Sequence, residues 1–239
     1  AELPDLLESL RSEWQSLATE SERLDQIEAE LRQAEAEYRQ LALSLRTSRQ
    51  AAAQALADAV TERMQGLAMD GGRFDVSLEN ARDERPSASG WDQIEFLVSA
   101  NPGQPLRPLS KVASGGELSR ISLAIQVVTA GNALIPTLIF DEVDVGIGGA
   151  VAETVGTLLR QLGEQRQVLC VTHLPQVAAL GHHHLVVNKV SSGKKTSTTI
   201  APLVDTDRVD ELARMLGGTE ITAQTEAHAR EMIARAQEV

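Results

Sequence analysis

TLIFDEVD, residues 137–144, joins a short apolar run directly to two carboxylates. The run Thr137 to Phe140 has the length and apolar character of a buried strand, and Asp141 and Glu142 follow it without a spacer. Ligands of open α/β sheets bind at the carboxyl ends of parallel strands, so this pair is expected at a ligand-binding edge. In nucleotide hydrolysis the first of two such carboxylates holds Mg²⁺ through water, and the second orients and deprotonates the attacking water. A polar surface turn after a strand has the same composition and stays an alternative.

A second apolar run, residues 167–171, ends in Thr172 and His173. Strand and helix patterns alternate after residue 114, which indicates parallel pairing with crossover helices. A neighbouring parallel strand would bring His173 to the same edge as Glu142, where the imidazole could hydrogen-bond a terminal phosphate oxygen. A single histidine at a strand end more often has a structural role, so both interpretations stay open at this point.

The third polar element is VASGGELSR, residues 112–120, at the start of a predicted helix. Ser114 can cap that helix, while Gly115 and Gly116 would let backbone N–H groups approach a ligand with no Cβ in the way. The helix dipole favours an anion at the same place. The stretch therefore fits an anion site, although a plain helix start has the same residues.

An apolar seam dominates the first part of the chain. Its members follow the three-and-four spacing of a coiled coil, with one three-residue slip at Ile27 that would overwind the coil without ending it. They are Leu3, Leu7, Leu10, Trp14, Leu17, Leu24, Ile27, Leu31, Ala34, Tyr38, Leu41 and Leu45. Pro4 stands near the start and no glycine occurs before Gly66, which predicts one helix over residues 5–66. At 1.5 Å per residue, about 60 residues reach roughly 90 Å, so the helix must project from any domain of this size and needs a partner.

The rest of the chain predicts an α/β domain. A two-residue period marks strands at residues 74–78 and 94–98, and further strands are expected at 137–140, 167–171, 184–190 and 196–203. Helices are expected from Ser114 onward and at 148–162, 207–216 and 221–237. The fold class is thus α/β, a mostly parallel sheet with flanking helices, preceded by a long coiled-coil helix; the expected domains are 1–66 and 67–239.

Charge and composition narrow the function. The formal net charge of −12 argues against a surface that is a nucleic-acid footprint throughout, but a local one stays open. The single cysteine, Cys170, lies in an apolar run, so we expect no disulfide within the chain and a buried thiol in a reducing compartment. No apolar run approaches the roughly 18 residues of a membrane span and the N-terminus is acidic, so neither a span nor a secretory signal is predicted. The expected location is the cytoplasm.

The order of these elements resembles the second half of an ABC-type ATPase head. SGGE at a helix start looks like the ABC signature, TLIFDE like the Walker B strand, Asp144 like the D-loop aspartate and His173 like the switch histidine. The flanks are very similar to the RecN family of bacterial DNA-repair proteins, relatives of the SMC proteins. The similar segments are NPGQPLRPLSKVASGGELSRISLAI (101–125), IFDEVDVGIGG (139–149), VTHLPQVAA (171–179), ELARMLGG (211–218) and ITAQTEAHAREM (221–232). The resemblance covers residues 95–239 by specific motifs and residues 1–66 by coiled-coil character alone.

The resemblance implies a role for each motif. Asp141 would position Mg²⁺ through water, Glu142 would be the general base, and His173 would sense the γ-phosphate of ATP. Asp144 would lie at the seam between two heads, where it would help to align the water and the opposite head. The signature residues would close on a nucleotide that the opposite head holds; they are Ser114, Gly115, Gly116 and Glu117.

One motif of such a head is missing. No GxxxxGK[ST] loop, which places the β- and γ-phosphates beside Mg²⁺, occurs in the 239 residues. In the RecN family this loop lies in an N-terminal half that precedes the coiled coil. The resemblance therefore implies the C-terminal half of a split head with the returning arm of its coil. Its partners would be the N-terminal half, a second head in a homodimer, and DNA. Its function would be ATP-gated engagement of DNA in double-strand break repair, in association with the nucleoid.

Two other functions stay open on the sequence alone. Gly146, Gly148 and Gly149 lie between a strand and a helix, as in dinucleotide-binding enzymes, but Val151 occupies the third glycine position of that motif. The nearby carboxylates would also repel a pyrophosphate that has no bound metal. The second alternative is a coiled-coil tether whose head only dimerises or docks a partner. A tether has no need of Glu142 at the end of a buried strand. A requirement for this residue would therefore distinguish an ATPase head from a tether.

Overall fold

The computed structural model describes residues 2–80, 86–112, 114–130, 135–192, 195–217 and 220–238. It divides into two compact units, one made of residues 1–52 and 78–94 and the other of residues 53–77 and 95–239. Helix α1 (Glu2–Gln65) and strands β1 (Arg73–Asn80) and β2 (Asp92–Ser99) contribute to both units. The division into an arm, 1–66, and a head, 67–239, stays a prediction.

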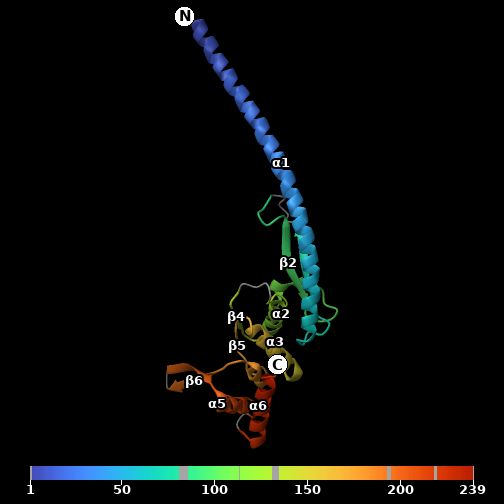
Figure 1. Cartoon of the computed structure of the whole chain (residues 1–239), viewed down its shortest axis with the longest axis vertical. Helices are drawn as coiled ribbons and strands as arrows, with labels where there is room; N and C mark the ends of the chain where they lie inside the picture. Colours follow the sequence, from blue (N-terminus) through green and yellow to red (C-terminus); the bar gives the residue numbers. More distant parts are fainter. Residues whose placement is uncertain are drawn as a thin grey trace. The chain divides into compact units, whose positions relative to one another are not determined.

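The long N-terminal helix is present, as the sequence predicts. α1 runs without interruption for 64 residues, through the three-residue slip at Ile27 (Figure 1). Alanine, leucine, glutamate, glutamine and arginine are strong helix formers and make up most of it. In the first unit the seam side chains lie at the surface, and Leu3, Trp14 and Leu41 are 74%, 71% and 71% exposed. Within the described part of that unit, these three side chains are therefore not covered.

A polar and aromatic cluster fixes the segment around Asp92 to α1 in the first unit. The Asp92 carboxylate, 1% exposed, accepts hydrogen bonds from Arg46 Nη1 at 2.9 Å and Arg49 Nη1 at 3.2 Å. Tyr38 and Trp91 pack edge to face, with ring centroids 6.1 Å apart. Because a buried carboxylate needs partners for its charge, the two guanidinium groups decide where this segment meets the helix.

α1 ends in a tight turn inside the second unit. Ala68 has a φ of 58°, in the left-handed region that commonly ends a helix. The Gln65 side chain spans the turn: its Nε2 donates to Gly72 O at 3.0 Å, and its Oε1 accepts from Gly71 N at 2.6 Å. The Thr61 hydroxyl accepts from Phe74 N at 3.0 Å, which ties the start of β1 to the last turns of α1.

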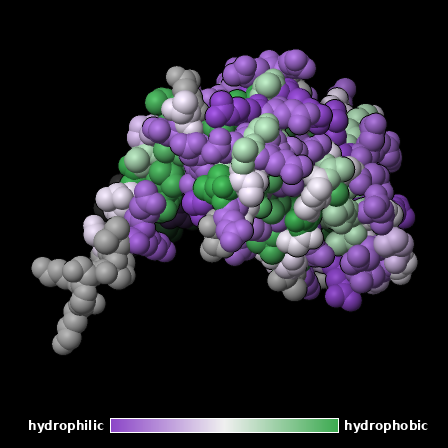
Figure 2. All heavy atoms as spheres, turned by 90° about the horizontal axis from the view of Figure 1, so that it is seen from below, coloured by the Kyte–Doolittle hydropathy of each residue, from purple (hydrophilic) through white to green (hydrophobic). Residues whose placement is uncertain are grey.

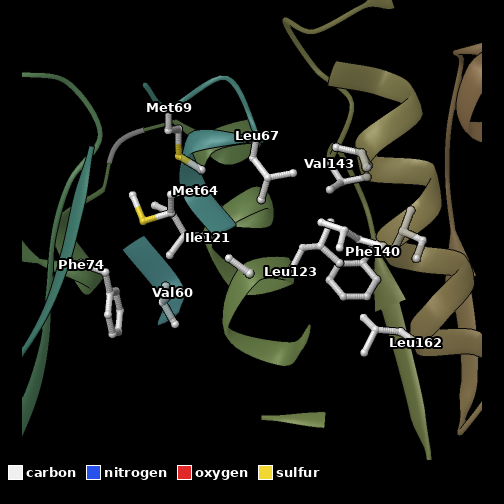
Figure 3. Close-up of a cluster of buried hydrophobic side chains, with 14 of the residues drawn as sticks. Val60, Met64, Leu67, Met69, Phe74, Ile121, Leu123, Phe140, Val143 and Leu162 are labelled. Carbon is white, nitrogen blue, oxygen red and sulfur yellow. The ribbon is translucent and has the colours of Figure 1, made fainter. Parts of the chain in front are cut away.

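The main core of the second unit lies between the end of α1 and strand β4 (Thr137–Phe140) (Figure 3). Ile121 and Leu123 of helix α2 (Gly115–Val128) lie between Val60 of α1 and Phe140 of β4. The largest fully buried apolar side chains of this core are Val60, Met64, Leu67, Ile121, Leu123, Val143 and Val155. Each such side chain contributes about 1.5–3 kcal/mol of burial free energy, so the last turns of α1 are part of this core.

The strands form three small sheets. β1, β2 and β3 (Arg107–Pro108) form the first, β4 and β5 (Gln167–Cys170) the second, and β6 (His184–Ser192) and β7 (Lys195–Leu203) the third. β4 and β5 are parallel, in a register from Thr137 opposite Gln167 to Phe140 opposite Cys170, and α3 (Gly149–Gly163) is their crossover helix. This pair confirms the predicted α/β class. The pairs β2–β3 and β6–β7 are antiparallel, and the sequence predicts no helix between the two strands of either pair.

Three further helices complete the second unit: α4 (Pro175–Leu180), α5 (Asp205–Gly217) and α6 (Ala223–Ala236), with a 3₁₀ turn at Leu109–Lys111. α5 and α6 agree with the predicted helices, whereas α4 is too short to have a periodic pattern. The three helices enclose a second, smaller core of Ala178, Ala179, Leu212, Ala213 and Ala229. On the face seen in Figure 2, apolar patches lie among hydrophilic residues. None of the helices in the described part of the chain has both the length and the apolar character to cross a membrane.

Candidate active site

β4 ends at the surface in two carboxylates. The side chains of Asp141 and Glu142 are both exposed. Asp141 Oδ1 accepts a hydrogen bond from Glu142 N at 2.9 Å, which orients the first carboxylate. Glu142 has a φ of 58°, a left-handed conformation that non-glycine residues rarely adopt outside turns and functional sites. The chain thus turns at Glu142, and both carboxylates stay exposed at the end of β4.

The start of α2 packs directly against this turn. Ser114 is the N-cap residue, and its Oγ accepts a hydrogen bond from Glu117 N at 3.4 Å. A Cβ added to Gly115 would overlap a carboxylate oxygen of Glu142, and one added to Gly116 would lie 3.2 Å from Val145 O. A Cβ would therefore meet the end of the Glu142 side chain at Gly115 and would crowd a backbone carbonyl at Gly116, in addition to narrowing the open backbone that the sequence suggested for a ligand. Ala113, within the same motif, lies outside the described residues.

Two side chains of α2 hold the loop that follows β4. Ser119 Oγ donates to Asp141 O at 2.7 Å, and Arg120 Nη1 donates to Val145 O at 2.8 Å. Arg120 is 7% exposed, and burial lowers the pKa of its guanidinium, against a smaller opposite effect of Glu117. The sequence analysis did not single out Ser119 or Arg120. Their only signal is the helical spacing of three and four residues from Gly116, which places them one turn farther along α2.

Asp144 lies inside the chain, against the loop that follows β5. It is 2% exposed, and its Oδ2 accepts from Thr172 Oγ1 at 2.5 Å and from His173 N at 3.1 Å. His173 Nδ1 lies 3.2 Å from the same oxygen, while the histidine side chain is 67% exposed. The neighbours of Asp144 thus come from its own chain. The exposed residues of its loop are Val145, Gly146 and Gly148.

Cys170 stands at the end of β5, next to these carboxylates. Burial, followed by the charges of Asp144 and Asp141, raises the pKa of the Cys170 thiol from 9.0 to about 12. The residue is only half-buried, in contrast to the fully buried thiol that the sequence suggested. Its thiolate is nevertheless strongly disfavoured, because partial burial and, to a smaller extent, the two nearby negative charges both favour the neutral thiol.

The structure brings the predicted residues together in two groups. Glu142 lies against Gly115, and Asp144 lies against His173; Glu142 and His173 form no hydrogen bond or ion pair with each other within the described residues. The hard oxygen of Asp141 suits Mg²⁺, which is held by one or two carboxylates through retained waters. In the described ranges no three or more His, Cys, Asp or Glu side chains form a group that could hold a metal ion. The residues present fit a contribution to an Mg²⁺ site but do not complete one.

No family model matches the chain. The DNA repair protein RecN of Haemophilus influenzae is 48% identical over 98% of this chain and 40% of its own length. RecN of Vibrio cholerae is 52% identical over 79% of this chain and 34% of its own length, and RecN of Xylella fastidiosa is 45% identical over 96% and 41%. Among solved structures, the Smc head domain with a coiled coil from Pyrococcus yayanosii has a TM-score of 0.48 at 20% identity, over 66% of this chain and 28% of that one. The chain spans about 40% of the length of the first of these relatives.

Proposed function

This chain belongs to the RecN family, and we propose on that basis that it forms the C-terminal lobe of an ATPase head that serves DNA repair. The single observation that carries the proposal is the exposed Asp141–Glu142 pair at the carboxyl end of the parallel strand β4. A coiled-coil tether needs no such pair, and a dinucleotide would be repelled by it, so the geometry favours hydrolysis of a metal-bound nucleotide.

Each side chain has a task in this proposal. Glu142 accepts a proton from the water that attacks the γ-phosphate, and its carboxylate lies next to Gly115 at the start of α2. Asp141 would hold Mg²⁺ through water, and the ion would supply positive charge next to the phosphate oxygens. His173 donates a hydrogen bond to the γ-phosphate from its exposed ring edge.

The signature residues act on a second nucleotide in this proposal. The N-terminus of α2 offers its dipole and unpaired N–H groups to the phosphates of an ATP held by the opposite head. The residues concerned are Ser114, Gly115, Gly116 and Glu117. ATP between two heads would stabilise the closed state, and opening and closing would gate DNA engagement. The proposed role in DNA repair rests on the similarity of the chain to the DNA repair proteins RecN.

Uncovered apolar surface supports a missing lobe that carries the phosphate-binding loop. Ile139, Leu169 and Val171 on one face of the β4–β5 pair are 70%, 40% and 61% exposed. A shallow hollow of about 270 Å³ between α2 and β4 adjoins Asp141 and is lined by Leu118, Ser119, Ser122, Gln126, Leu138, Ile139, Phe140 and Asp141. We assign this face to the other part of the RecN protein, and the exposed seam of α1 to its antiparallel coiled-coil arm.

Reconstitution tests the proposal. The N-terminal part of Haemophilus influenzae RecN that this chain does not match would be co-expressed with the chain, and ATP hydrolysis measured with and without DNA. We expect no turnover from the chain alone, and turnover from the complex that Glu142→Gln lowers by about 10²-fold or more. Glu153→Gln, an exposed glutamate on α3, is the matched control and should leave turnover unchanged. Robust hydrolysis by the chain alone would overturn the split-head proposal.

A further inference from the structure

We propose that Asp144 is a positioning residue that fixes the ring of His173. It holds the imidazole by Nδ1 and thereby leaves Nε2 for the ligand. The meaning of this arrangement for catalysis rests on the proposed function, in which His173 contacts a phosphate. The positioning of the ring rests only on contacts within this chain. An experiment can therefore contradict the positioning of the ring without contradicting the proposed function, and the reverse.

One carboxylate oxygen carries the whole arrangement. Asp144 Oδ2 accepts hydrogen bonds from Thr172 Oγ1 at 2.5 Å and from His173 N at 3.1 Å, and His173 Nδ1 lies 3.2 Å from the same oxygen. Thr172 Oγ1 also accepts from Leu174 N at 3.0 Å, which closes the loop around the threonine hydroxyl. Because His173 N donates to this oxygen and Nδ1 lies near it, a ring held by Nδ1 has its Nε2 directed away from the carboxylate.

The burial of the two partners gives the pair a direction. Asp144 is 2% exposed and His173 has a side chain that is 67% exposed, so one end is anchored in the protein and the other faces outward. A carboxylate only accepts, so a hydrogen bond between Nδ1 and Asp144 requires the proton to lie on Nδ1. In the neutral ring the other nitrogen, Nε2, then has no proton and is available to a ligand. Metal-binding histidines use the same arrangement: a carboxylate binds one ring nitrogen and thereby leaves the other nitrogen for the metal.

The aspartate is itself held on both sides. Val143, one residue before it, is 0% exposed and belongs to the main core. Val145, one residue after it, has its carbonyl oxygen bound by Arg120 of α2. Because the residues on both sides of Asp144 are held by the core and by Arg120, the position of its carboxylate is well defined. A functional side chain is positioned accurately only when the residues that support it are themselves rigid. A merely structural hydrogen bond would have no reason to leave the partner ring exposed.

The proton position on His173 can be measured directly in the ¹⁵N-labelled 239-residue chain. Two-bond ¹H–¹⁵N correlation spectra at a pH about two units above the ordinary histidine pKa of about 6.5 distinguish Nδ1–H from Nε2–H, and His173→Gln identifies the signal. We expect Nδ1–H in the wild-type chain and a shift to Nε2–H in Asp144→Ala. Thr172→Val removes one hydrogen bond to the same carboxylate and should keep Nδ1–H. Nε2–H in the wild type, or an unchanged proton position in Asp144→Ala, would overturn the proposal.

A second variant covers the case in which Asp144→Ala does not fold. Asp144→Asn keeps the shape but removes the charge, and we expect a larger Nε2–H fraction than in the wild type; an identical fraction overturns the proposal. In the reconstituted enzyme, Asp144→Ala or Asp144→Asn should lower kcat by roughly 10- to 100-fold with little change in KM. If kcat is unchanged in variants whose His173 proton has moved from Nδ1 to Nε2, the positioning of the ring by Asp144 has no role in catalysis. Absence of turnover in the wild-type complex, with Nδ1–H retained, contradicts the proposed function and leaves the positioning of the ring intact.

Discussion

At the scale of single residues, the backbone of Glu142 is the most unusual feature of the site. A left-handed φ of 58° costs a non-glycine residue about 1–2 kcal/mol, and the surrounding turn must stabilise it. Its carboxylate is exposed, so substitutions there test the backbone with little effect on packing. The turn keeps the proposed general base in place before any ligand arrives.

The effect of replacing Glu142 on the free energy of unfolding should therefore depend on how easily the new residue adopts a left-handed backbone conformation. We expect Glu142→Asn to keep the free energy of unfolding within about 0.5 kcal/mol of the wild type, because asparagine adopts this region readily. Glu142→Val should lower it by about 1–2 kcal/mol, because a β-branched side chain does not. Urea unfolding of the 239-residue chain measures both, and equal stabilities of the two variants would contradict the expectation.

Cys170 gives a second prediction at the residue scale. Its pKa is raised from 9.0 to about 12, so at any pH below about 9 the folded chain should have on the order of 10³ times less thiolate than the unfolded chain. Alkylation by iodoacetamide should be slower in the folded chain by a comparable factor, and Asp144→Asn should speed it. Since the raised pKa favours the neutral thiol, its contribution to stability is present below about pH 9 and is lost as the pH rises toward about 12. Equal alkylation rates in folded and unfolded chains would rule out the shift.

At the scale of elements, Arg120 connects α2 to the loop after β4. Arg120→Ala removes the donor to Val145 O and a buried side chain, so we expect the free energy of unfolding to fall by about 2 kcal/mol. Arg107→Ala, at an exposed arginine, is the control and should change it by less than about 0.5 kcal/mol. Chemical denaturation distinguishes the two, and similar effects would show that the hydrogen bond contributes no stability.

The elements differ in how far the sequence predicts them. α1 and the β4–β5 pair follow from periodicity and from the apolar run that ends in Asp141, because these signals are local. The Arg120 contact with Val145 joins positions 25 residues apart, and that of Asp144 with Thr172 joins positions 28 residues apart, so no local pattern reports them. The resemblance placed Asp144 at a seam between heads, whereas its burial depends on how β4 and β5 meet. Residue types at the site were thus predictable, but the partners that orient them were not.

At the scale of the whole molecule, the exposed seam of α1 predicts self-association of the isolated chain. Leu10, Trp14 and Leu17 are 56%, 71% and 66% exposed on one helix, and such surface favours a second copy when the natural arm is absent. Sedimentation velocity should show a mass that increases with concentration. Replacing the three residues with glutamine should yield a monomer, and so should co-expression with the other arm in a one-to-one complex. A monomer at all concentrations would argue that the seam has no affinity for a helix.

The shared core of α1 and α2 has a mechanical consequence. Val60 and Met64 in the last turns of α1 are packed in the same core as Ile121 and Leu123 of α2, with 0% exposure at all four positions. Packed interiors are nearly incompressible, so these last turns cannot rotate while α2 keeps its place. Torque on the end of the coil would thus be transmitted to the helix that carries the signature. In the proposed ATPase, mechanical tension on the N-terminal part of α1 would then influence the helix that carries Ser114 to Glu117, in addition to any effect of a nucleotide.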